Sequence, residues 1–227
     1  RIPNAGIMYS KDRGTTWHLH NLARTNTTEA QVAEIEPGVL MLNMRDNRGG
    51  SRAVATTRDL GKTWYEHPSS RSALQEPVCM ASLIHVDAKD NITGKDLLIF
   101  SNPNTTKGRN HITIKVSTDG GMTWPLSNQV TLDEDESWGY SCLSMIDKET
   151  VGIFYESSVA HMTFQAVKLT DLVKESCMKR ILFILISLYI GILAACAANI
   201  PHLLPWPQKV AWNGKKFQYR GTFVSLT

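Results

Sequence analysis

The sequence predicts an all-β fold made of repeated small sheets. Three stretches share the form Ser/Thr-x-Asp-x-Gly-x-Thr-Trp: SKDRGTTW (10–17), TRDLGKTW (57–64) and STDGGMTW (117–124). Their tryptophans lie 47 and 60 residues apart. That interval matches a four-stranded blade of a β-propeller with loops of variable length, and it is too long for a helical repeat. The repeats therefore predict successive propeller blades.

Each position of the repeat has a role in closing a β-hairpin. The aspartate side chain can accept hydrogen bonds from backbone N–H groups of its own turn, and the glycine can adopt a positive φ. The tryptophan can pack the hairpin against its sheet. We therefore expect each repeat to be a turn between two strands, with its tryptophan packed on the sheet.

Apolar or alternating stretches between the repeats predict the strands. They are VLMLNM (39–44), AVAT (53–56), LLIF (97–100) and ITIKV (112–116). Turn-rich stretches separate them: DNRGG (46–50), DAKDN (87–91) and NPN (102–104). No long apolar stripe with a helical period competes with these strands, so we expect one all-β domain over residues 1–174.

Composition excludes several classes of function. The chain has 24 basic and 21 acidic side chains, a net charge of +3 and no run of Lys or Arg, so nucleic acid is not an expected partner. The four cysteines lack CxxC and zinc-type His spacing, so they predict neither a metal site nor a disulfide framework. The loop with Asp87, Asp90, Asn91 and Asp96 lacks the D-x-D-x-D-G spacing of a calcium loop, and we interpret it as a solvated hairpin loop. We expect no metal and no cofactor.

The chain changes character near Met178. Ile181 to Ala198 contains no charged side chain and follows directly on Met178-Lys179-Arg180. A basic start, an apolar stretch and an ending LAAC are typical of a secretory signal, and the ending resembles a bacterial lipobox in which Cys196 would be lipidated. We expect residues 175–198 to form one apolar helix. At about 18 residues it is near the minimum for crossing a bilayer, so we expect membrane association through Ile181 to Ala198 where this segment is present.

A signal of this kind belongs at an N-terminus, so its position suggests that two neighbouring reading frames are fused here. Residues 199–227 are then the start of a second, unrelated domain or a disordered tail. Their sequence ANIPHLLPWPQKVAWNGKKFQY resembles the start of a secreted bacterial β-hexosaminidase.

Residues 1–174 resemble the C-terminal catalytic half of bacterial exo-α-sialidases (neuraminidases). The three repeats look like sialidase Asp-boxes. The same likeness extends to TNTTEAQVAEIEPGVLMLNMRDNRGG, LLIFSNPNTTKGRNHITIKVSTDGGMTW and ESWGYSCLSMIDKETVGIFYE. The resemblance implies a partial six-bladed β-propeller of the sialidase type, followed here by the apolar helix. It also implies retaining hydrolysis of terminal sialic acids from sialylated glycans, by a protein that is secreted, periplasmic or at the cell surface.

The resemblance makes Tyr140, in SWGYSCL, the nucleophile and Glu29, in TTEAQ, the base that removes its proton. Sialic acid carries a carboxylate on its anomeric carbon, so a carboxylate nucleophile would approach against like charge, whereas a neutral phenol does not. A phenol with an ordinary pKa of about 10 is almost wholly protonated at neutral pH. It therefore needs a carboxylate within hydrogen-bonding reach.

The resemblance also assigns the groups that hold the substrate. Planar guanidinium groups bind a carboxylate through two hydrogen bonds, and sialidases use three arginines. Arg45 in MLNMRDN and Arg109 in KGRNHIT match the second and third, and Glu156 in IFYES matches the carboxylate that pairs with the first.

The family places the first arginine and its acid/base aspartate in upstream blades. The opening Arg1-Ile2-Pro3 imitates the motif of that arginine, but it directly precedes a repeat, and we interpret it as an incidental match. Without these two groups we expect little or no turnover from this chain alone.

Alternatives remain open from the residues themselves. A non-catalytic Asp-box propeller that binds glycans or proteins is the second hypothesis, and transfer of sialic acid to another sugar is the third. Taken singly, Tyr140 also fits a core tyrosine, and the charged residues fit solvated loops. Propeller geometry favours a joint site, because inner strands of successive blades converge at one channel mouth. We treat Cys142 as a packing residue and the acidic run 133–136 as a solvated loop.

Overall fold

The computed structural model describes residues 2–158 and 161–174. Arg1, Cys196, the predicted apolar helix and residues 199–227 lie outside this part. Within it the chain is almost entirely β-strand, with short 3₁₀ turns at Ala88–Asp90 (η1) and Leu126–Asn128 (η2) and one short helix, α1 (Leu169–Leu172). None of the helices in this part is long and apolar enough to span a membrane. The all-β prediction is confirmed for the described residues.

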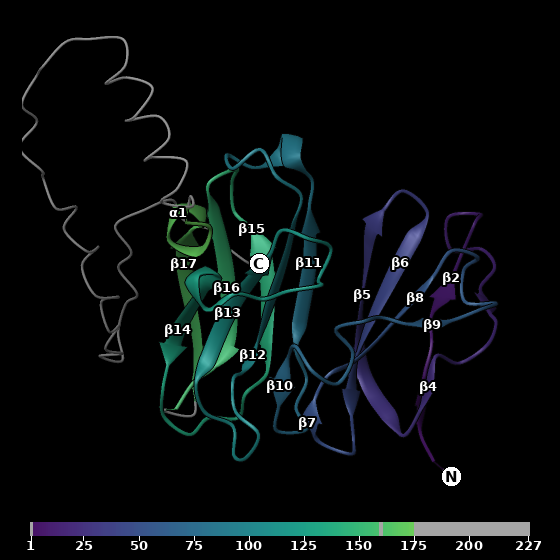
Figure 1. The fold of residues 1–227 in the computed structure, drawn as a ribbon, viewed down its shortest axis with the longest axis horizontal. Helices are drawn as coiled ribbons and strands as arrows, with labels where there is room; N and C mark the ends of the chain where they lie inside the picture. Colours follow the sequence, from purple (N-terminus) through teal and green to yellow (C-terminus); the bar gives the residue numbers. More distant parts are fainter. Residues whose placement is uncertain (1, 159–160, 175–227) are drawn as a thin grey trace, which may run out of the picture. The chain divides into compact units, whose positions relative to one another are not determined.

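Three antiparallel sheets of three or four strands make up most of the fold (Figure 1). The first contains β5 (Thr27–Glu36), β6 (Val39–Asp46), β8 (Ala53–Thr57) and β9 (Tyr65–Glu66). The second contains β11 (Ser82–Val86), β12 (Leu97–Pro103), β13 (Ile112–Ser117) and β14 (Gln129–Asp133). The third contains β15 (Ser141–Met145), β16 (Thr150–Glu156) and β17 (Met162–Lys168). The four predicted strands are β6, β8, β12 and β13, which extend one to three residues beyond the predicted ends.

Three two-stranded pairings complete the described part. They join β1 (Asn4–Ala5) to β4 (Arg24–Thr25), β2 (Met8–Tyr9) to β3 (His18–Leu19), and β7 (Gly50–Ser51) to β10 (Gln75–Glu76). The opening strand of the second sheet, β11, contacts the opening strands of the other two, β5 and β15. This contact brings together residues that begin or precede those strands, although they are far apart in the sequence.

The apolar core lies between successive sheets. One cluster joins the second and third sheets and includes the fully buried Ile99, Ile114 and Ile153. Another joins the first and second sheets and includes Met41 and Phe100. Because side chains on a strand alternate between its two faces, each sheet can supply a core on both sides.

One face of the third sheet is exposed. Phe154 pairs with Cys142 on β15 and with Phe164 on β17, so the three side chains share this face. Phe154 is 51% exposed and Phe164 is 42% exposed, and their ring centroids lie 4.8 Å apart. Cys142 is also exposed. Within the described residues nothing covers this side of the sheet, so Cys142 does not pack there as we expected.

All three repeats form the predicted turns. In each repeat, the backbone N–H of the threonine directly before the tryptophan donates to Oδ1 of the aspartate. The distances are 2.8 Å for Asp12, 2.9 Å for Asp59 and 2.9 Å for Asp119. The hydroxyl of the same threonine also donates to the aspartate, and this side-chain hydrogen bond, followed by the backbone one, lowers the pKa of Asp12 and of Asp59 to about 2. The shared geometry explains why the motif recurs at each hairpin.

The predicted burial of the tryptophans holds only where a large sheet is available. Trp124 is 8% exposed and packs beside Phe100, with 5.7 Å between ring centroids. Trp64 is half-buried against the first sheet. Trp17 is 60% exposed, so the prediction is wrong there. Its repeat joins β2 to β3, which are two residues each and offer little apolar surface to pack on.

Candidate active site

Tyr140 and Glu29 meet although they are 111 residues apart in the sequence. The Tyr140 hydroxyl donates a hydrogen bond to Glu29 Oε1. Tyr140 directly precedes β15, and Glu29 lies near the start of β5. The hydrogen bond to the carboxylate raises the pKa of Tyr140, and burial adds to the effect, because both disfavour the phenolate. The phenol is thus held in its neutral form beside a group that can accept its proton.

Arg45 contacts the other oxygen of the same carboxylate. Its Nη1 lies 2.5 Å from Glu29 Oε2. Burial alone would raise the pKa of Glu29, but the hydrogen bonds from Tyr140 and Arg45 outweigh it, and the pKa is lowered. Glu29 is therefore ionised at neutral pH, with one oxygen toward the phenol and one toward the guanidinium.

A β-bulge places Glu29 in this position. Thr27 pairs with Asp46 and Ala30 pairs with Met44, so Thr28 and Glu29 both lie opposite Arg45. An extra residue in one strand bends that strand and re-aims its side chain. The bulge therefore turns Glu29 toward Tyr140 and Arg45.

Arg109 approaches the face of the phenol. It lies in the loop between β12 and β13, and its guanidinium carbon is 5.6 Å from the centroid of the Tyr140 ring. Its Nη1 donates to the backbone carbonyl of Trp138 at 2.8 Å. The structure thus brings four of the five predicted residues, Tyr140, Glu29, Arg45 and Arg109, into one group.

Glu156, the fifth predicted residue, holds the backbone of Tyr140. Its Oε2 accepts the Tyr140 N–H at 3.1 Å, and its own N–H donates to the Tyr140 carbonyl at 2.9 Å. In residues 2–158 and 161–174 no arginine forms an ion pair with Glu156. The two hydrogen bonds between Glu156 and the backbone of Tyr140 fix the position of Tyr140 just before β15.

The acidic run 133–136 is not a purely solvated loop as predicted. Glu136 Oε2 accepts the backbone N–H of Arg109 at 3.0 Å, and Oε1 accepts the side-chain amide of Asn110 at 3.0 Å. Asp133 Oδ2 accepts the N–H of Ser158 at 3.1 Å. Glu136 therefore holds the loop that carries Arg109 in place. The sequence alone did not indicate this contact, because Glu136 and Arg109 are 27 residues apart.

Gly139 allows Tyr140 to lie close to the neighbouring strand. Its φ is +87°, and a Cβ at this position would lie 2.8 Å from Pro103 Cγ and 3.1 Å from Cys79 Sγ. The first distance is shorter than real Cβ atoms show and the second is tighter than most of them, so a side chain here would force Pro103 or the start of β15 to shift. The glycine next to a predicted nucleophile was a signal available in the sequence.

We expect Gly139→Ala to destabilise the chain by more than backbone strain alone, which is about 1–3 kcal/mol for a positive φ. Gly38→Ala is the matched control, because Gly38 has a φ of +77° and a methyl group added there would have nothing within 4 Å. Urea unfolding of the two variants checks the expectation. Equal losses would show that the contacts at residue 139 are relieved at no cost.

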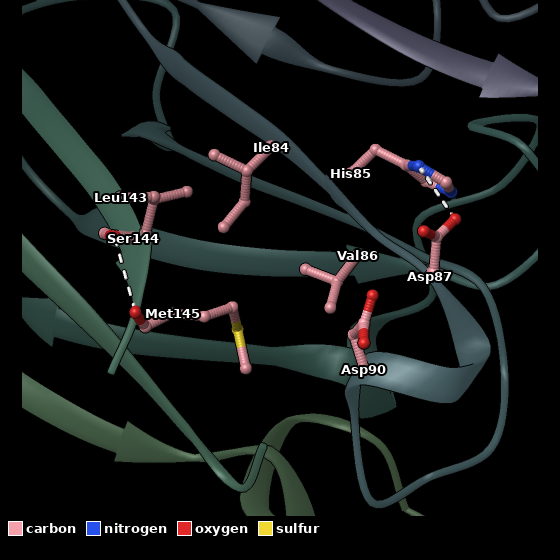
Figure 2. Close-up of a pocket in the computed structure, with 8 residues that line it drawn as sticks. All are labelled: Ile84, His85, Val86, Asp87, Asp90, Leu143, Ser144 and Met145. Carbon is pink, nitrogen blue, oxygen red and sulfur yellow. Dashed lines mark hydrogen bonds and ion pairs between the residues drawn. The ribbon is translucent and has the colours of Figure 1, made fainter. Parts of the chain in front are cut away.

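A separate hollow lies at the far ends of β11 and β15 (Figure 2). It has a volume of about 310 Å³ and is lined by Ile84, His85, Val86, Asp87, Asp90, Leu143, Ser144 and Met145. Tyr140 and Glu29 precede or begin the opening strands, whereas the lining residues end or follow them, and none of the five predicted site residues lines the hollow. The hollow is therefore distinct from the group around Tyr140.

The loop beside this hollow differs in part from the prediction. Asn91 is buried rather than solvated, and its side-chain amide donates to the backbone carbonyls of Asp87 and Lys95, both at 2.8 Å. His85, Asp87 and Asp96 have potential ligand atoms within 4.8 Å of one another. However, Asp96 Oδ1 already accepts the N–H of Ala88 at 2.8 Å, and Asp96 and Asp87 are exposed.

Comparisons with known proteins agree with the fold and the motifs. The family described as BNR repeat-like domain matches residues 3–155. A sialidase of Bacteroides fragilis is 78% identical over 174 residues, which are 77% of this chain and 32% of that protein. A sialidase of Micromonospora viridifaciens is 33% identical over 152 residues, which are 66% of this chain and 23% of that protein. The solved structure of the Hadza microbial sialidase Hz136 matches with a TM-score of 0.74 and 71% identity, over 76% of this chain and 34% of that one.

The fold and the matched residues define an all-β protein with BNR repeats. More particularly, the chain belongs to the sialidase family and has the sialidase fold. It spans about a third of the length of the Bacteroides fragilis sialidase and of Hz136.

Proposed function

We propose that this chain supplies the nucleophile, its base and two substrate-binding arginines of a retaining exo-α-sialidase. The observation that carries the proposal is the contact of Tyr140 with Glu29, whose second oxygen pairs with Arg45. In the first step the Tyr140 oxygen bonds to the anomeric carbon, the bond to the leaving sugar breaks, and the phenolic proton passes to Glu29. The oxygen of the leaving sugar needs a proton from an acid. For this role we propose the acid/base aspartate that the family places in upstream blades.

In the second step water attacks the anomeric carbon and gives a proton to the proposed aspartate, which lost its own to the leaving sugar, and the bond between Tyr140 and the anomeric carbon breaks. Glu29, now protonated, returns its proton to the phenolate oxygen as tyrosine leaves. Each step inverts the anomeric carbon, so two steps retain its configuration. A neutral phenol suits this reaction because the carbon that it attacks carries a negatively charged carboxylate group. Arg45 pairs with Glu29 and Arg109 lies over the phenol ring, and both would hold the substrate carboxylate while it reacts.

A chimera tests this proposal. Residues 1–174 of this chain replace the matching stretch of the Bacteroides fragilis sialidase, which is 78% identical over 174 residues. We expect the chimera to hydrolyse a fluorogenic sialoside and this chain by itself to show little or no turnover. A chimera that binds sialyllactose without hydrolysing it would favour the alternative, a non-catalytic propeller that binds glycans. Full activity of the chain by itself would contradict the need for the two further groups.

We also propose that the three sheets are blades of a six-bladed propeller. The contacts of β11 with β5 and β15 support it, because opening strands that neighbour one another are typical of blades around a central channel. The exposed apolar face of the third sheet, with Phe154, Phe164 and the 64% exposed Met162, supports it as well. Such a face is usually covered by another element, and in a propeller that element is the next blade.

For residues 175–198 we propose a lipoprotein signal with Cys196 as the lipidated residue, and for the sialidase part a secreted, periplasmic or cell-surface location. The support is the sequence pattern alone, a basic start followed by an uncharged stretch and LAAC. Fractionation of cells that express the 227-residue chain tests membrane association. Complete recovery in the soluble fraction without detergent would contradict it.

A further inference from the structure

A fully buried ion pair lies beneath the group around Tyr140. Arg52, between β7 and β8, has its Nη1 2.8 Å from Oε2 of Glu76 on β10, and neither side chain has any exposed surface. Burying two charges costs several kcal/mol per ion before their attraction offsets it, and apolar pairs of similar volume often stabilise a fold as well. Stability alone is therefore a weak reason for this pair.

The guanidinium of Arg52 uses all five of its N–H groups. Nε donates to Asn43 Oδ1 at 2.7 Å, and Nη1 donates to Glu76 and to the Cys79 carbonyl, both at 2.8 Å. Nη2 donates to the carbonyls of Asn43 at 3.3 Å and Glu29 at 3.4 Å. A guanidinium has five donors in a fixed plane, so this arrangement leaves Arg52 no freedom to move without losing a partner.

These contacts fall on the two strand segments that carry the site. The Glu29 carbonyl belongs to the bulge that aims the Glu29 side chain at Tyr140. Asn43 precedes Arg45 by two residues, and the second oxygen of Glu76 accepts the N–H of Asp46 at 2.9 Å, one residue after Arg45. The pair thus forms hydrogen bonds to the bulge on β5 and to residues before and after Arg45 on β6.

We propose that Arg52 and Glu76 form a positioning pair, which fixes the backbone so that the Glu29 carboxylate bridges the Tyr140 hydroxyl and Arg45. This inference rests on the proposed function, since it concerns how the base is held. Neither residue touches the phenol or is placed to touch a substrate. They act through the main chain of Glu29 and the strand of Arg45.

The ionisation of Tyr140 in the 227-residue chain tests the pair without any need for turnover. The chain is labelled with ¹³C at the phenolic carbon of its six tyrosines, and Tyr140→Phe identifies the Tyr140 signal in detergent solution. Contact with Glu29 raises the pKa of Tyr140, so its signal should titrate at a higher pH than free tyrosine. A carboxylate that is no longer held against the hydroxyl would let this titration move down toward the ordinary value of about 10.

Two variants change the pair in different ways. Arg52→Lys keeps a charge for Glu76 but lacks the planar fork that reaches the Glu29 and Asn43 carbonyls. The double variant Arg52→Met with Glu76→Leu replaces the pair by apolar side chains, a change that commonly leaves stability intact. Arg58→Lys is the control, because Arg58 is 70% exposed and pairs with Glu36 at 3.5 Å on the surface.

We expect the Tyr140 titration to move down in both Arg52 variants and to stay in place in Arg58→Lys. An unchanged Tyr140 titration in a folded Arg52 variant, as judged by circular dichroism, would overturn the positioning role and leave the proposed function standing. A wild-type Tyr140 that titrates like free tyrosine would remove the contact with Glu29 itself, and both proposals would fail together.

Discussion

Tyr140→Phe in the chimera should lower kcat for an aryl sialoside by roughly 10³-fold or more, with the Kd for sialyllactose changed by less than about threefold. The substitution removes one oxygen atom, the atom that bonds to the anomeric carbon in the proposed first step. Arg45, paired with Glu29, and Arg109, over the ring, stay in place to bind the substrate carboxylate. Steady-state kinetics and calorimetric titration measure the two quantities.

Tyr155→Phe is the matched control. Tyr155 lies on β16 of the same sheet, is 2% exposed, and its hydroxyl accepts a hydrogen bond from Gln165 at 2.8 Å. The same loss of one hydroxyl there should leave kcat within about twofold, because one hydrogen bond contributes only about 1 kcal/mol to stability. If Tyr140→Phe hydrolyses the sialoside as fast as this control, Tyr140 is not the nucleophile.

Glu29→Gln should lower kcat by about 10²- to 10⁴-fold, the usual contribution of a positioned general base. The pKa of Glu29 is lowered by its hydrogen bonds to Tyr140 and Arg45, against the effect of burial. The carboxylate therefore stays ionised below the ordinary glutamate value of about 4.3, and the wild-type rate should fall only as the pH drops through the lowered pKa. Glutamine does not titrate, so the variant should lack that acid limb.

Glu36→Gln serves as the control for the second substitution. Glu36 ends the same strand, β5, and is 66% exposed in a surface pair with Arg58. Its loss should leave kcat and the acid limb unchanged. An acid limb that persists in Glu29→Gln would assign that titration, and the role of base, to another group.

The sequence was sufficient for the elements that depend on local pattern. The strands β6, β8, β12 and β13 follow from apolar alternation, and the three repeats follow from aspartate and glycine at fixed spacing. The errors concern burial, which depends on what lies across from a side chain. In the described part of the chain, Trp17 is exposed because its hairpin has no large sheet beneath it, and Cys142 is exposed because no described residue covers its face of the third sheet.

In the candidate site, too, the sequence indicated some residues but not the contacts that depend on the fold. Family resemblance named Tyr140, Glu29 and Arg45, but their contact depends on β5 and the start of β15 being brought together across 111 residues. Arg52 and Glu76 were missed because the partners are 24 residues apart, and a lone charge beside a strand is usually solvated. The local sign of the pair in the sequence was a charged residue, Arg52, directly before the apolar stretch AVAT (53–56).

Trapping the covalent intermediate tests the central claim most directly. A sialosyl fluoride with a second fluorine at C3 reacts slowly at the anomeric carbon, because the added fluorine disfavours positive charge there, while fluoride remains a good leaving group. After the chimera is treated and digested, mass spectrometry should find the added sugar on the peptide that contains Tyr140. An adduct on a different residue, or inactivation that leaves the Tyr140 peptide unmodified, would contradict a tyrosine nucleophile at this position.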